Sequence, residues 1–464
     1  MFNIRDKLQL SEECRDWDDA DIRPYIPVID AINFKALIAA ARKCRITVEP
    51  HAQSLSCSIE SNILGSYHVI SVLVFSDGLK WVAKVPRYGI APTFGELTQE
   101  RMLSEILTLR LIRSRTAVPV PEIYDWDTTR CKIGVPYILM TFLPGTSLDR
   151  LWFDRDWATE EMRMHVLGNL ARTMSDLHSL RFNEIGSLKF DEKGDFSGVG
   201  PVISQTEGDI FHPEFDMIDG NQTIRWPPAS AYGPFRTAKS FLLAGVEALD
   251  AEKGLSPVAR KQRTADIAVL HFAIESIPER LSLDDGDSFI VAHPNLDAPN
   301  ILVDDDGNIT GVIDWDGVQT MPRGYGFSCY PSWITRDWDP IMYGCSEPGY
   351  EDTPETLSRY RQAYASAFQD VNLPSCDYIP DETRLSHIYE AIYIAASSYW
   401  NLSPIDKLLE HAFRGTSDEP FVVEDFRRNL ANELECGKGD ELLAQINMAF
   451  RKMWYPEWEY GLAL

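Results

Sequence analysis

One stretch in the second half of this 464-residue chain constrains its fold more than any other. Residues 293–300 read His-Pro-Asn-Leu-Asp-Ala-Pro-Asn, and residues 313–316 read Ile-Asp-Trp-Asp. Between them, short apolar segments flank an Asp-Asp-Gly turn, which predicts a hairpin of two short strands. Because a hairpin returns the chain to where it started, we expect the two polar clusters to form one site.

The spacing of these polar residues suits phosphoryl transfer of the kinase type. That reaction needs an acid to receive or orient the acceptor hydroxyl, an Asn five residues later to hold magnesium, and an Asp after a hairpin to bridge the metal to the phosphates. Asn300 and Asp314 fill the last two places, fourteen residues apart. They are therefore the predicted magnesium ligands.

The stretch resembles the H-G-D-x-x-x-x-N and I-D-W-[DE] signature of the aminoglycoside phosphotransferase and choline kinase-like superfamily, with a fungal branch as the nearest match. The resemblance implies an α+β, bilobal protein kinase-like fold, with a small antiparallel-sheet N-lobe and a larger, mainly helical C-lobe. Further segments follow in the family's order and extend the resemblance over about residues 60–340: SEILTLRLIRSRTAVPVPEIYDWD, YILMTFLPGTSL, SDLHSLRF and ITGVIDWDGVQTMPRGYG.

Hydrophobic periodicity and turn residues suggest how the chain divides. VISVLVF (69–75) and KWVAKVP (80–86) flank a Ser-Asp-Gly turn, which predicts a hairpin, and the helix formers of 95–115 predict a helix after it. Helical spacing dominates from about 150 to 285, apart from an irregular insertion at 193–235. We expect three parts: a helical N-terminal extension (1–60), a nucleotide-binding N-lobe of sheet and helix (61–143), and a helical C-lobe (144–464) that carries the catalytic loop 293–300 and the metal motif 313–316.

The resemblance implies nucleotide-binding roles for two charged residues of the N-lobe. Lys84, in Val-Ala-Lys on the second hairpin strand, stands where the family's lysine contacts the phosphates. Glu105 is the best match to the helix glutamate that pairs with this lysine. Taken alone, Lys84 would be a solvated strand charge, and Glu105 would be one of several helix acids beside Glu96 and Glu100.

Two further nucleotide-binding features rest on single residues. Gly65 and Ser66 stand where protein kinases carry several glycines over the phosphates, although a lone glycine is equally an ordinary turn residue. Met140, in the apolar strand 137–140 before Leu-Pro-Gly, would face the adenine, although such a strand is most simply core. All three residues belong to the predicted nucleotide site.

The predicted catalytic residues contain a departure from the family. Asn295 stands where the family carries its catalytic aspartate, and an amide cannot accept a proton, so we expect a slower enzyme or none. Asp297 is either a substitute base or the occupant of a variable position at which a polar residue binds acceptor or phosphate. His293 is expected to brace the loop through hydrogen bonds to the backbone near Asp314.

Three other features border this motif. Asp316 would assist the metal shell or only hydrate the loop. The acidic run 304–307 is better explained by a hairpin turn than by a calcium loop, because no glutamate follows at the required position. Trp333 and Trp338, soon after the metal motif, are candidates to line the acceptor pocket.

Two classes of function fit these residues. The first is an aminoglycoside phosphotransferase-like kinase that uses Mg²⁺ and transfers the γ-phosphate of ATP to a hydroxyl of an unidentified small molecule. The alternative is a pseudokinase, a nucleotide-binding or scaffold protein with little catalysis because of Asn295. A third class, an interaction protein with partner surfaces at the Trp-rich segments 331–340 and 454–458, is disfavoured because core packing explains Trp more often.

Charge and composition limit the partners. The net charge of −26 argues against nucleic acid, which is held by clusters of Lys and Arg. It suits a cationic acceptor, although an acidic surface also serves plain solubility. The cysteines show no metal-binding spacing, and we find neither a signal-peptide core nor an apolar run long enough to span a bilayer. We therefore expect reduced thiols, no membrane partner and a cytoplasmic protein.

Overall fold

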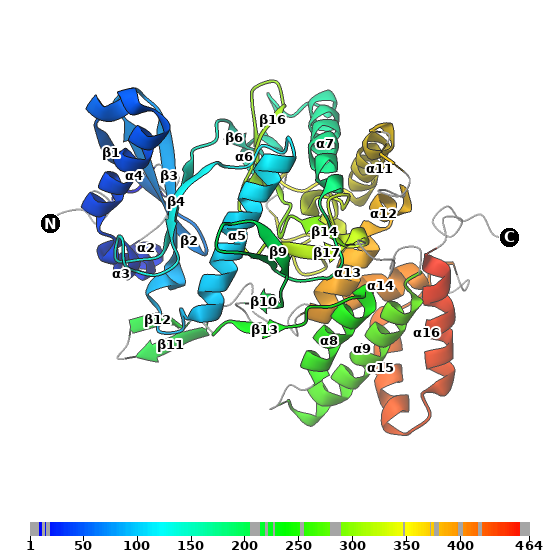
Figure 1. Cartoon of the computed structure of the whole chain (residues 1–464). Helices are drawn as coiled ribbons and strands as arrows, with labels where there is room; N and C mark the ends of the chain where they lie inside the picture. The colour runs from blue at the N-terminus through cyan, green and yellow to red at the C-terminus, as the bar shows by residue number, and fades with distance from the viewer. Residues whose placement is uncertain are drawn as a thin grey trace.

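A sheet-containing lobe and a larger, mostly helical lobe make up the chain (Figure 1). Parts of the sequence expectations fall outside the residues that the structure describes, among them residues 1–8, residues 205–213 of the expected insertion, the cysteine at position 376, and the segment 455–458. A computed structural model describes residues 9–11, 14, 19–204, 214–218, 221–225, 228–250, 255–278, 289–346, 349–371, 373–374, 380–397, 402–415 and 420–454.

The small lobe is built on a five-stranded antiparallel sheet with the order β1-β2-β3-β5-β4. Its central hairpin forms where the sequence predicts it, because β-branched residues flank a turn whose Gly78 has a φ of +88°. The first strand begins before residue 61, so the sheet starts inside the segment expected to be a helical extension. The strands are β1 (Cys57–Leu64), β2 (His68–Phe75), β3 (Lys80–Pro86), β4 (Ile123–Asp127) and β5 (Tyr137–Thr141).

Helices cover both faces of this sheet. Alternation along β3 sends Trp81 and Ala83 into a cluster with the N-terminal helices, which include α2 (Asp19–Ile22), α3 (Ile26–Ala31) and α4 (Phe34–Val48). On the other face, Ile138 and the partly buried Val82 pack against α5 (Glu96–Arg115), the helix predicted over 95–115. Lys84 follows Val82 by two residues, so it shares the α5 face.

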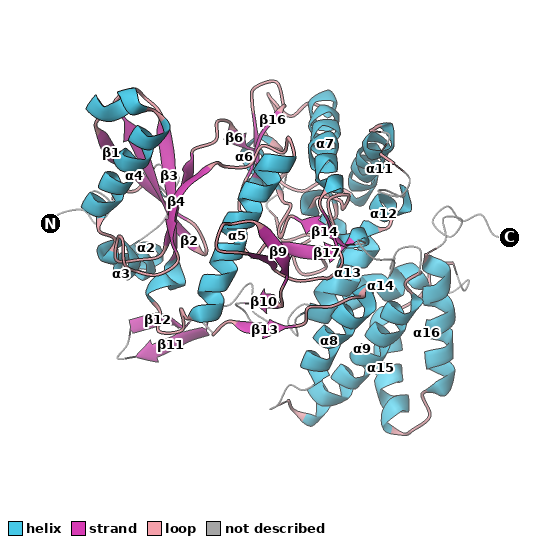
Figure 2. Cartoon of the chain, in the orientation of Figure 1, coloured by secondary structure: helices cyan, strands magenta, loops and turns pink. Residues whose placement is uncertain are grey.

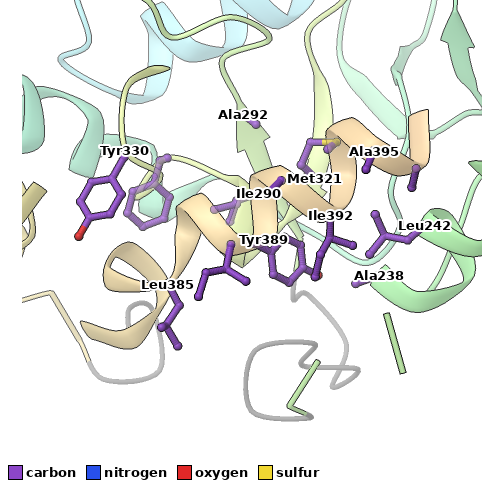
Figure 3. Close-up of a cluster of buried hydrophobic side chains, with 14 of the residues drawn as sticks. Ala238, Leu242, Ile290, Ala292, Met321, Tyr330, Leu385, Tyr389, Ile392 and Ala395 are labelled. Atoms are coloured by element: carbon purple, nitrogen blue, oxygen red, sulfur yellow. The ribbon is translucent and has the colours of Figure 1, made fainter. Parts of the chain in front are cut away.

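The large lobe packs its helices around one extensive core. In Figure 3, Ile290 and Met321 of two paired strands lie against Tyr389 and Ile392 of a single helix, and all four are buried. This core fixes the strand that leads into the catalytic loop. The helices, shown in Figure 2, are α6 (Leu148–Leu151), α7 (Glu160–Ser175), α8 (Ala238–Asp250), α9 (Pro257–Ser276), α11 (Pro354–Asp370), α12 (Pro380–Arg384), α13 (Ser386–Ser397), α14 (Pro404–Ala412), α15 (Val423–Glu435) and α16 (Asp440–Met453).

Short strands in the large lobe carry the site loops. β14 (Phe289–Ala292) pairs with β17 (Gln319–Pro322) and β7 (Arg181–Phe182), and β15 (Ile301–Val303) pairs with β16 (Ile309–Val312) and β6 (Thr146–Ser147). The expected hairpin around the Asp-Asp-Gly turn is thus present as β15 and β16. The segment expected to be irregular, 193–235, contains paired strands: β9 (Phe196–Val199), which pairs with the preceding β8 (Leu188–Phe190), β10 (Val202–Ser204), β11 (Glu214–Ile218), β12 (Asn221–Arg225) and β13 (Ser230–Tyr232).

These observations confirm the predicted α+β, bilobal kinase-like fold. Trp454 of the Trp-rich C-terminal segment is fully buried, and its Nε1 donates to Ser276 Oγ at 2.9 Å, so it is core and not a partner surface. Within the described residues, no single helix has the length and apolar composition to cross a bilayer. One bent pair, Arg23–Ala31 with Phe34–Val48, meets that test only when both helices are taken together.

Candidate active site

Lys84 lies where the two lobes meet. Its Nζ atom is 2.9 Å from Glu105 Oε1 of α5 and 3.1 Å from Asp314 Oδ1, which follows β16 in the large lobe. The side chain is only 7% exposed, so it is not a solvated strand charge. Glu96 and Glu100 are exposed, whereas Glu105 is buried, so of these three helix acids Glu105 faces the lysine.

Burial and charge act in opposite directions on this ion cluster. Burial lowers the pKa of Lys84, but the nearby Glu105 and Asp314 carboxylates outweigh it and raise that pKa above its ordinary value. Burial raises the pKa of Glu105 to about 7; Lys84 opposes this shift, and the nearby Asp316 carboxylate adds to it. Burial also raises the pKa of Asp314, yet the Lys84 ammonium outweighs it and the net shift is downward. The lysine and Asp314 are therefore both charged at neutral pH.

Asp314 occupies an unusual backbone conformation. Its φ is +62°, in the left-handed region that residues other than glycine, Asn and Asp seldom adopt. Strain of this kind persists where the surrounding structure holds the chain in place, and it concentrates at functional sites. The side chain is closely surrounded by protein but 45% exposed, so its carboxylate remains accessible.

His293 braces the loop that precedes this aspartate. Its Nδ1 accepts a hydrogen bond from Asn295 N at 3.1 Å, so the neutral ring donates from Nε2 to Ile313 O at 2.9 Å. The ring also packs edge-on against Trp315, with centroids 4.5 Å apart. Burial lowers the pKa of His293 to about 4, which keeps the ring neutral at pH 7. The hydrogen bond to the backbone next to Asp314 is the one expected from the sequence.

The remaining residues of the loop are arranged by backbone hydrogen bonds. Asn300 Nδ2 donates to Asn295 O at 2.9 Å, and Asn300 O accepts from Ile313 N at 2.9 Å. The Asn295 side chain is exposed. Asp297 Oδ1 accepts from Ala298 N at 2.8 Å and caps the short 3-10 turn Ala298–Asn300, so one of its oxygens is occupied by the loop itself. The structure thus brings Asn300 next to the residue before Asp314.

The loop between β1 and β2 contains the expected phosphate-covering residues. Gly65 N donates to His68 O at 2.9 Å, which closes the hairpin turn. Tyr25 Oη donates to Gly65 O at 3.0 Å, and Arg87 Nη1 donates to Ser66 O at 2.6 Å. Gly65 and Ser66 are therefore held by the neighbouring helix and strand end, and their contact with phosphates stays a prediction.

Met140 lies on β5 in the hydrophobic cluster beneath α5. It is 7% exposed and belongs with Met102, Ile106 and Ile138 to that cluster. Met140 is therefore part of the core, as the alternative interpretation of its apolar strand predicted. A contact between Met140 and adenine stays a prediction.

The sequence reasoning missed Arg101 and His68 and left Asp316 open. Arg101 Nη1 lies 3.1 Å from Asp316 Oδ1, and His68 Nε2 lies 3.6 Å from Asp316 Oδ2. Burial, followed by Lys84, lowers the pKa of His68 to about 4, so this ring is neutral at pH 7. Burial raises the pKa of Asp316, but Arg101 and Lys84 hold it well below its usual range. The available signal was the position of Arg101 one helical turn before Glu105.

A pocket opens beside the catalytic loop. Its walls include His293, Pro294 and Asn295 from the loop, Ser332 from the following segment, and Glu390 from α13. The sequence predicts that Asn295 stands where the family carries its catalytic aspartate, and Asn295 lines this pocket. We therefore call it the candidate acceptor pocket.

Glu390 was also missed from the sequence. Burial raises its pKa to about 7, Asp297 and Asp339 add to the shift, and Thr335 Oγ1 donates to its Oε2 at 3.4 Å. The signal that could have found it is a single carboxylate in the otherwise uncharged helix SHIYEAIYIAAS, apart from its histidine.

The two tryptophans expected near the acceptor pack against other rings of the large lobe. Trp333 packs edge-on against Trp152 with centroids 5.7 Å apart, and Trp338 packs against His387 with centroids 4.5 Å apart. Both are partly buried against the core, and neither belongs to the walls of the acceptor pocket. Their rings pack against Trp152 and His387, and a contact with the acceptor stays a prediction.

Magnesium fits the donor set that the sequence predicted. Asn300 commits its amide NH₂ to Asn295 O, which leaves its side-chain oxygen on the other side of the amide group. Asp314 offers an accessible carboxylate. Mg²⁺ prefers oxygen ligands and usually takes one or two from the protein, with water and substrate phosphates completing the shell. Within the described residues no group of three or more His, Cys, Asp or Glu side chains is placed to hold a metal ion.

The comparison with protein families agrees with this geometry. Residues 71–369, more than half of the chain, match the model described as the phosphotransferase enzyme family, abbreviated APH. The chain belongs to this family, as the resemblance in its motifs predicted. The matched range includes Lys84, Glu105, the catalytic loop and Asp314, whereas Glu390 lies beyond it.

Individual relatives are distant. A subtelomeric hrmA-associated cluster protein of Aspergillus fumigatus is 22% identical over 57% of this chain and 59% of its own. Altered inheritance of mitochondria protein 9 of Zygosaccharomyces rouxii is 22% identical over 66% of this chain and 54% of its own, so the chain matches little more than half of each relative. A solved structure of a thermostable mutant of aminoglycoside phosphotransferase APH(4)-Ia, with AMP-PNP and hygromycin B, aligns over 89% of this chain and 98% of that chain at 12% identity and a TM-score of 0.40.

The predicted cytoplasmic location is wrong. The relatives from Zygosaccharomyces rouxii, Lachancea thermotolerans and Eremothecium gossypii are all named as mitochondrial proteins. The cytoplasmic expectation rested on the lack of an apolar secretory signal and of a membrane span. Mitochondrial targeting segments are amphipathic and contain neither feature, so their lack does not distinguish the two compartments.

Proposed function

We propose that the chain transfers the γ-phosphoryl group of ATP to a hydroxyl of a small molecule. The observation that carries this proposal is the position of Lys84 Nζ between Glu105 Oε1 and Asp314 Oδ1, at 2.9 and 3.1 Å. A buried lysine in this position can neutralise phosphate oxygens, while the glutamate fixes where its ammonium points. Asn300 and Asp314 would hold magnesium, which would neutralise charge on the phosphates during transfer.

The reaction places limited demands on the residues around the acceptor. The acceptor oxygen forms a bond to the γ-phosphorus, the bond from that phosphorus to the bridging oxygen breaks, and ADP leaves with the electron pair. The hydroxyl proton needs a base, and Asn295 cannot provide one. Asp297 and Glu390 are the nearby carboxylates, and Glu390 is the one that lines the same pocket as Asn295.

The acidity of the chain supports a cationic acceptor within this proposal. The net charge is −26, and the candidate acceptor pocket includes a carboxylate and no lysine or arginine. A field of this sign attracts cations and raises their local concentration. We therefore propose amino alcohols and amino sugars as the first acceptors to try, beside neutral sugars and nucleosides.

Asn295 favours a second candidate function, a pseudokinase that binds nucleotide without useful transfer. The two candidates are separated by Asn295→Asp. General-base assistance typically contributes about 10²–10⁴-fold, so we expect this variant to transfer phosphate from radiolabelled ATP to the best acceptor at least about 10-fold faster than the wild type. Asp314→Asn serves as the inactive control in the same assay.

The acceptor panel decides between the outcomes. Transfer by the wild type, increased in Asn295→Asp and abolished in Asp314→Asn, supports the phosphotransferase. No transfer by either the wild type or Asn295→Asp to any aminoglycoside, amino alcohol, sugar or nucleoside contradicts it and leaves the pseudokinase.

We also propose a mitochondrial location, which the names of the yeast relatives support. Subcellular fractionation of cells that express the protein with an epitope tag tests it. Co-sedimentation of the tag with a matrix or inner-membrane marker is the expected result, and recovery with a soluble cytosolic marker would refute the proposal.

A further inference from the structure

The bridge between Arg101 and Asp316 has no assigned role in the proposed reaction. Arg101 lies on α5, four residues before Glu105, so both side chains project from the same face of the helix. Arg101 Nη1 is 3.1 Å from Asp316 Oδ1, and the two side chains are 16% and 17% exposed. The bridge is therefore largely buried, unlike the exposed surface pairs that contribute little.

This bridge runs beside the one that holds the lysine. Glu105 reaches Asp314 through Lys84, and Arg101 reaches Asp316 directly. Two residues four apart on one helix thus engage two residues two apart on the loop after β16. The helix α5 belongs to the small lobe and the loop after β16 to the large lobe. Figure 1 shows where α5 and β16 lie in the chain. The two bridges therefore connect the lobes at the site.

The loop is shaped to accept the arginine. Gly317 has a φ of +79°, and a Cβ atom added there would lie 2.5 Å from Arg101 Nη2. A side chain at this position would displace the guanidinium. On its other sides the bridge is enclosed by His68, whose Nε2 lies 3.6 Å from Asp316 Oδ2, and by Tyr88, whose hydroxyl lies 3.5 Å from Arg101 Nη1.

We propose that Arg101 is a positioning residue for phosphoryl transfer. By pairing with Asp316, it holds α5 against the loop that carries Asp314, and so keeps Glu105 where it orients Lys84. Asp316 then acts as the anchor for this helix and not as a member of the metal shell. The role in phosphoryl transfer rests on the proposed function. The anchoring of α5 by Arg101 and Asp316 concerns the protein without nucleotide and can be tested separately.

A double-mutant cycle tests the pairing. We compare Arg101→Met, Asp316→Asn and the double variant with the wild type by calorimetric titration with Mg·ATP. Each single variant is expected to raise the dissociation constant about 10-fold, and the double variant to raise it no further, because the first change already removes the bridge. Arg101→Lys should recover part of the loss. Arg110→Met, an exposed arginine on the same helix, is the matched control and should leave the constant unchanged.

Two results of the titration would overturn the proposal. One is a double variant that loses about 100-fold, the product of two independent effects. The other is a large loss in Asp316→Asn with a raised magnesium requirement and no loss in Arg101→Met, which would make Asp316 a metal ligand.

Hydrogen–deuterium exchange of the nucleotide-free protein tests the anchoring of α5 separately. Arg101→Met should accelerate exchange in α5 at least several-fold and leave β14 and β17, in the large-lobe core, at wild-type rates. Unchanged exchange in α5 contradicts the proposal. If the wild type fails to bind Mg·ATP, the proposed function fails, while the exchange result still accepts or rejects the anchoring of α5.

Discussion

At the scale of single residues, Lys84 joins the two lobes through two ion pairs. Its ammonium contacts one carboxylate from α5 and one from the loop after β16, and burial makes each contact count for more than it would at the surface. The sequence predicted Lys84, Glu105 and Asp314 because each sits in a segment whose order along the chain matches the family. The segments fix which residues meet, and the structure adds the distances.

The substitution Glu105→Gln tests the orienting role of this glutamate. Without the carboxylate, Lys84 keeps Asp314 as its anion but loses the group that fixes its direction, so we expect the rate of phosphoryl transfer to fall about 10- to 100-fold. Glu100→Gln, an exposed acid on the same helix, is the matched control. Initial rates with radiolabelled ATP give the comparison. Equal rates in both variants would show that the glutamate has no orienting role.

Arg101 and Glu390 could not be predicted with the same means. A charged residue on a helix has several possible partners, and only packing in three dimensions selects one. Arg101 of the small lobe pairs with Asp316 of the large lobe, and Glu390 lies beyond the range that matches the family. Asn295 is the opposite case, because its departure from the family's expected aspartate is visible in the sequence, whereas its effect on proton transfer stays a prediction.

At the scale of elements, α13 connects the large-lobe core to the acceptor pocket. Tyr389 and Ile392 are buried in that core (Figure 3), whereas Glu390 between them lines the pocket. Successive residues on a helix point in directions about 100° apart, so one helix can serve both purposes. Packing on one face thus fixes a carboxylate on the other.

Two substitutions on α13 distinguish its role in core packing from its role in the acceptor pocket. Ile392→Ala leaves a cavity in the core and should cost about 2–5 kcal/mol of unfolding free energy in urea titrations. Glu390→Gln should change stability by less than about 1 kcal/mol but slow transfer to a hydroxyl acceptor at neutral pH about 10-fold or more. Full activity in Glu390→Gln would exclude this carboxylate as the proton acceptor.

The elements themselves were predicted to different extents. The hairpin β2–β3 and the helix α5 appear within one residue of their predicted bounds, because turn chemistry and helix formers mark them strongly. The strand β1, CSIESNIL, was missed, since its polar residues alternate with few apolar ones along an edge strand. The paired strands after residue 187 were missed because each spans only a few residues.

For the whole molecule, buried histidines predict how stability depends on pH. Burial lowers the pKa of His68, His293 and His411 to about 4, and that of His387 well below its ordinary value near 6.5. Between these values each of these histidines binds more protons in the unfolded chain than in the folded one, so their contribution to stability rises with pH across this window and falls on acidification, while the raised pKa values of Glu105 and Glu390 act in the opposite direction. The loss should begin below about pH 6.5.

His411 isolates one share of this effect, because it lies away from the site and is 4% exposed. Its lowered pKa corresponds to about 3 kcal/mol of unfolding free energy lost between pH 7 and pH 4. In urea titrations at pH 7 and pH 4, the unfolding free energy of His411→Phe should fall by about 3 kcal/mol less than that of the wild type. The unfolding free energy of His51→Gln, a change at an exposed histidine, should fall as much as that of the wild type. Identical pH dependence in His411→Phe and the wild type would contradict the assignment.

Binding of Mg·ATP tests the central claim for the molecule as a whole. Calorimetric titration of the wild type should show saturable binding with a dissociation constant below about 1 mM, and Asp314→Asn should abolish it. Asp306→Asn, an exposed acid at the tip of the same β15–β16 hairpin, should bind as the wild type does. A wild type that binds no Mg·ATP up to millimolar concentration, or an Asp314→Asn variant that binds it equally well, would contradict the account.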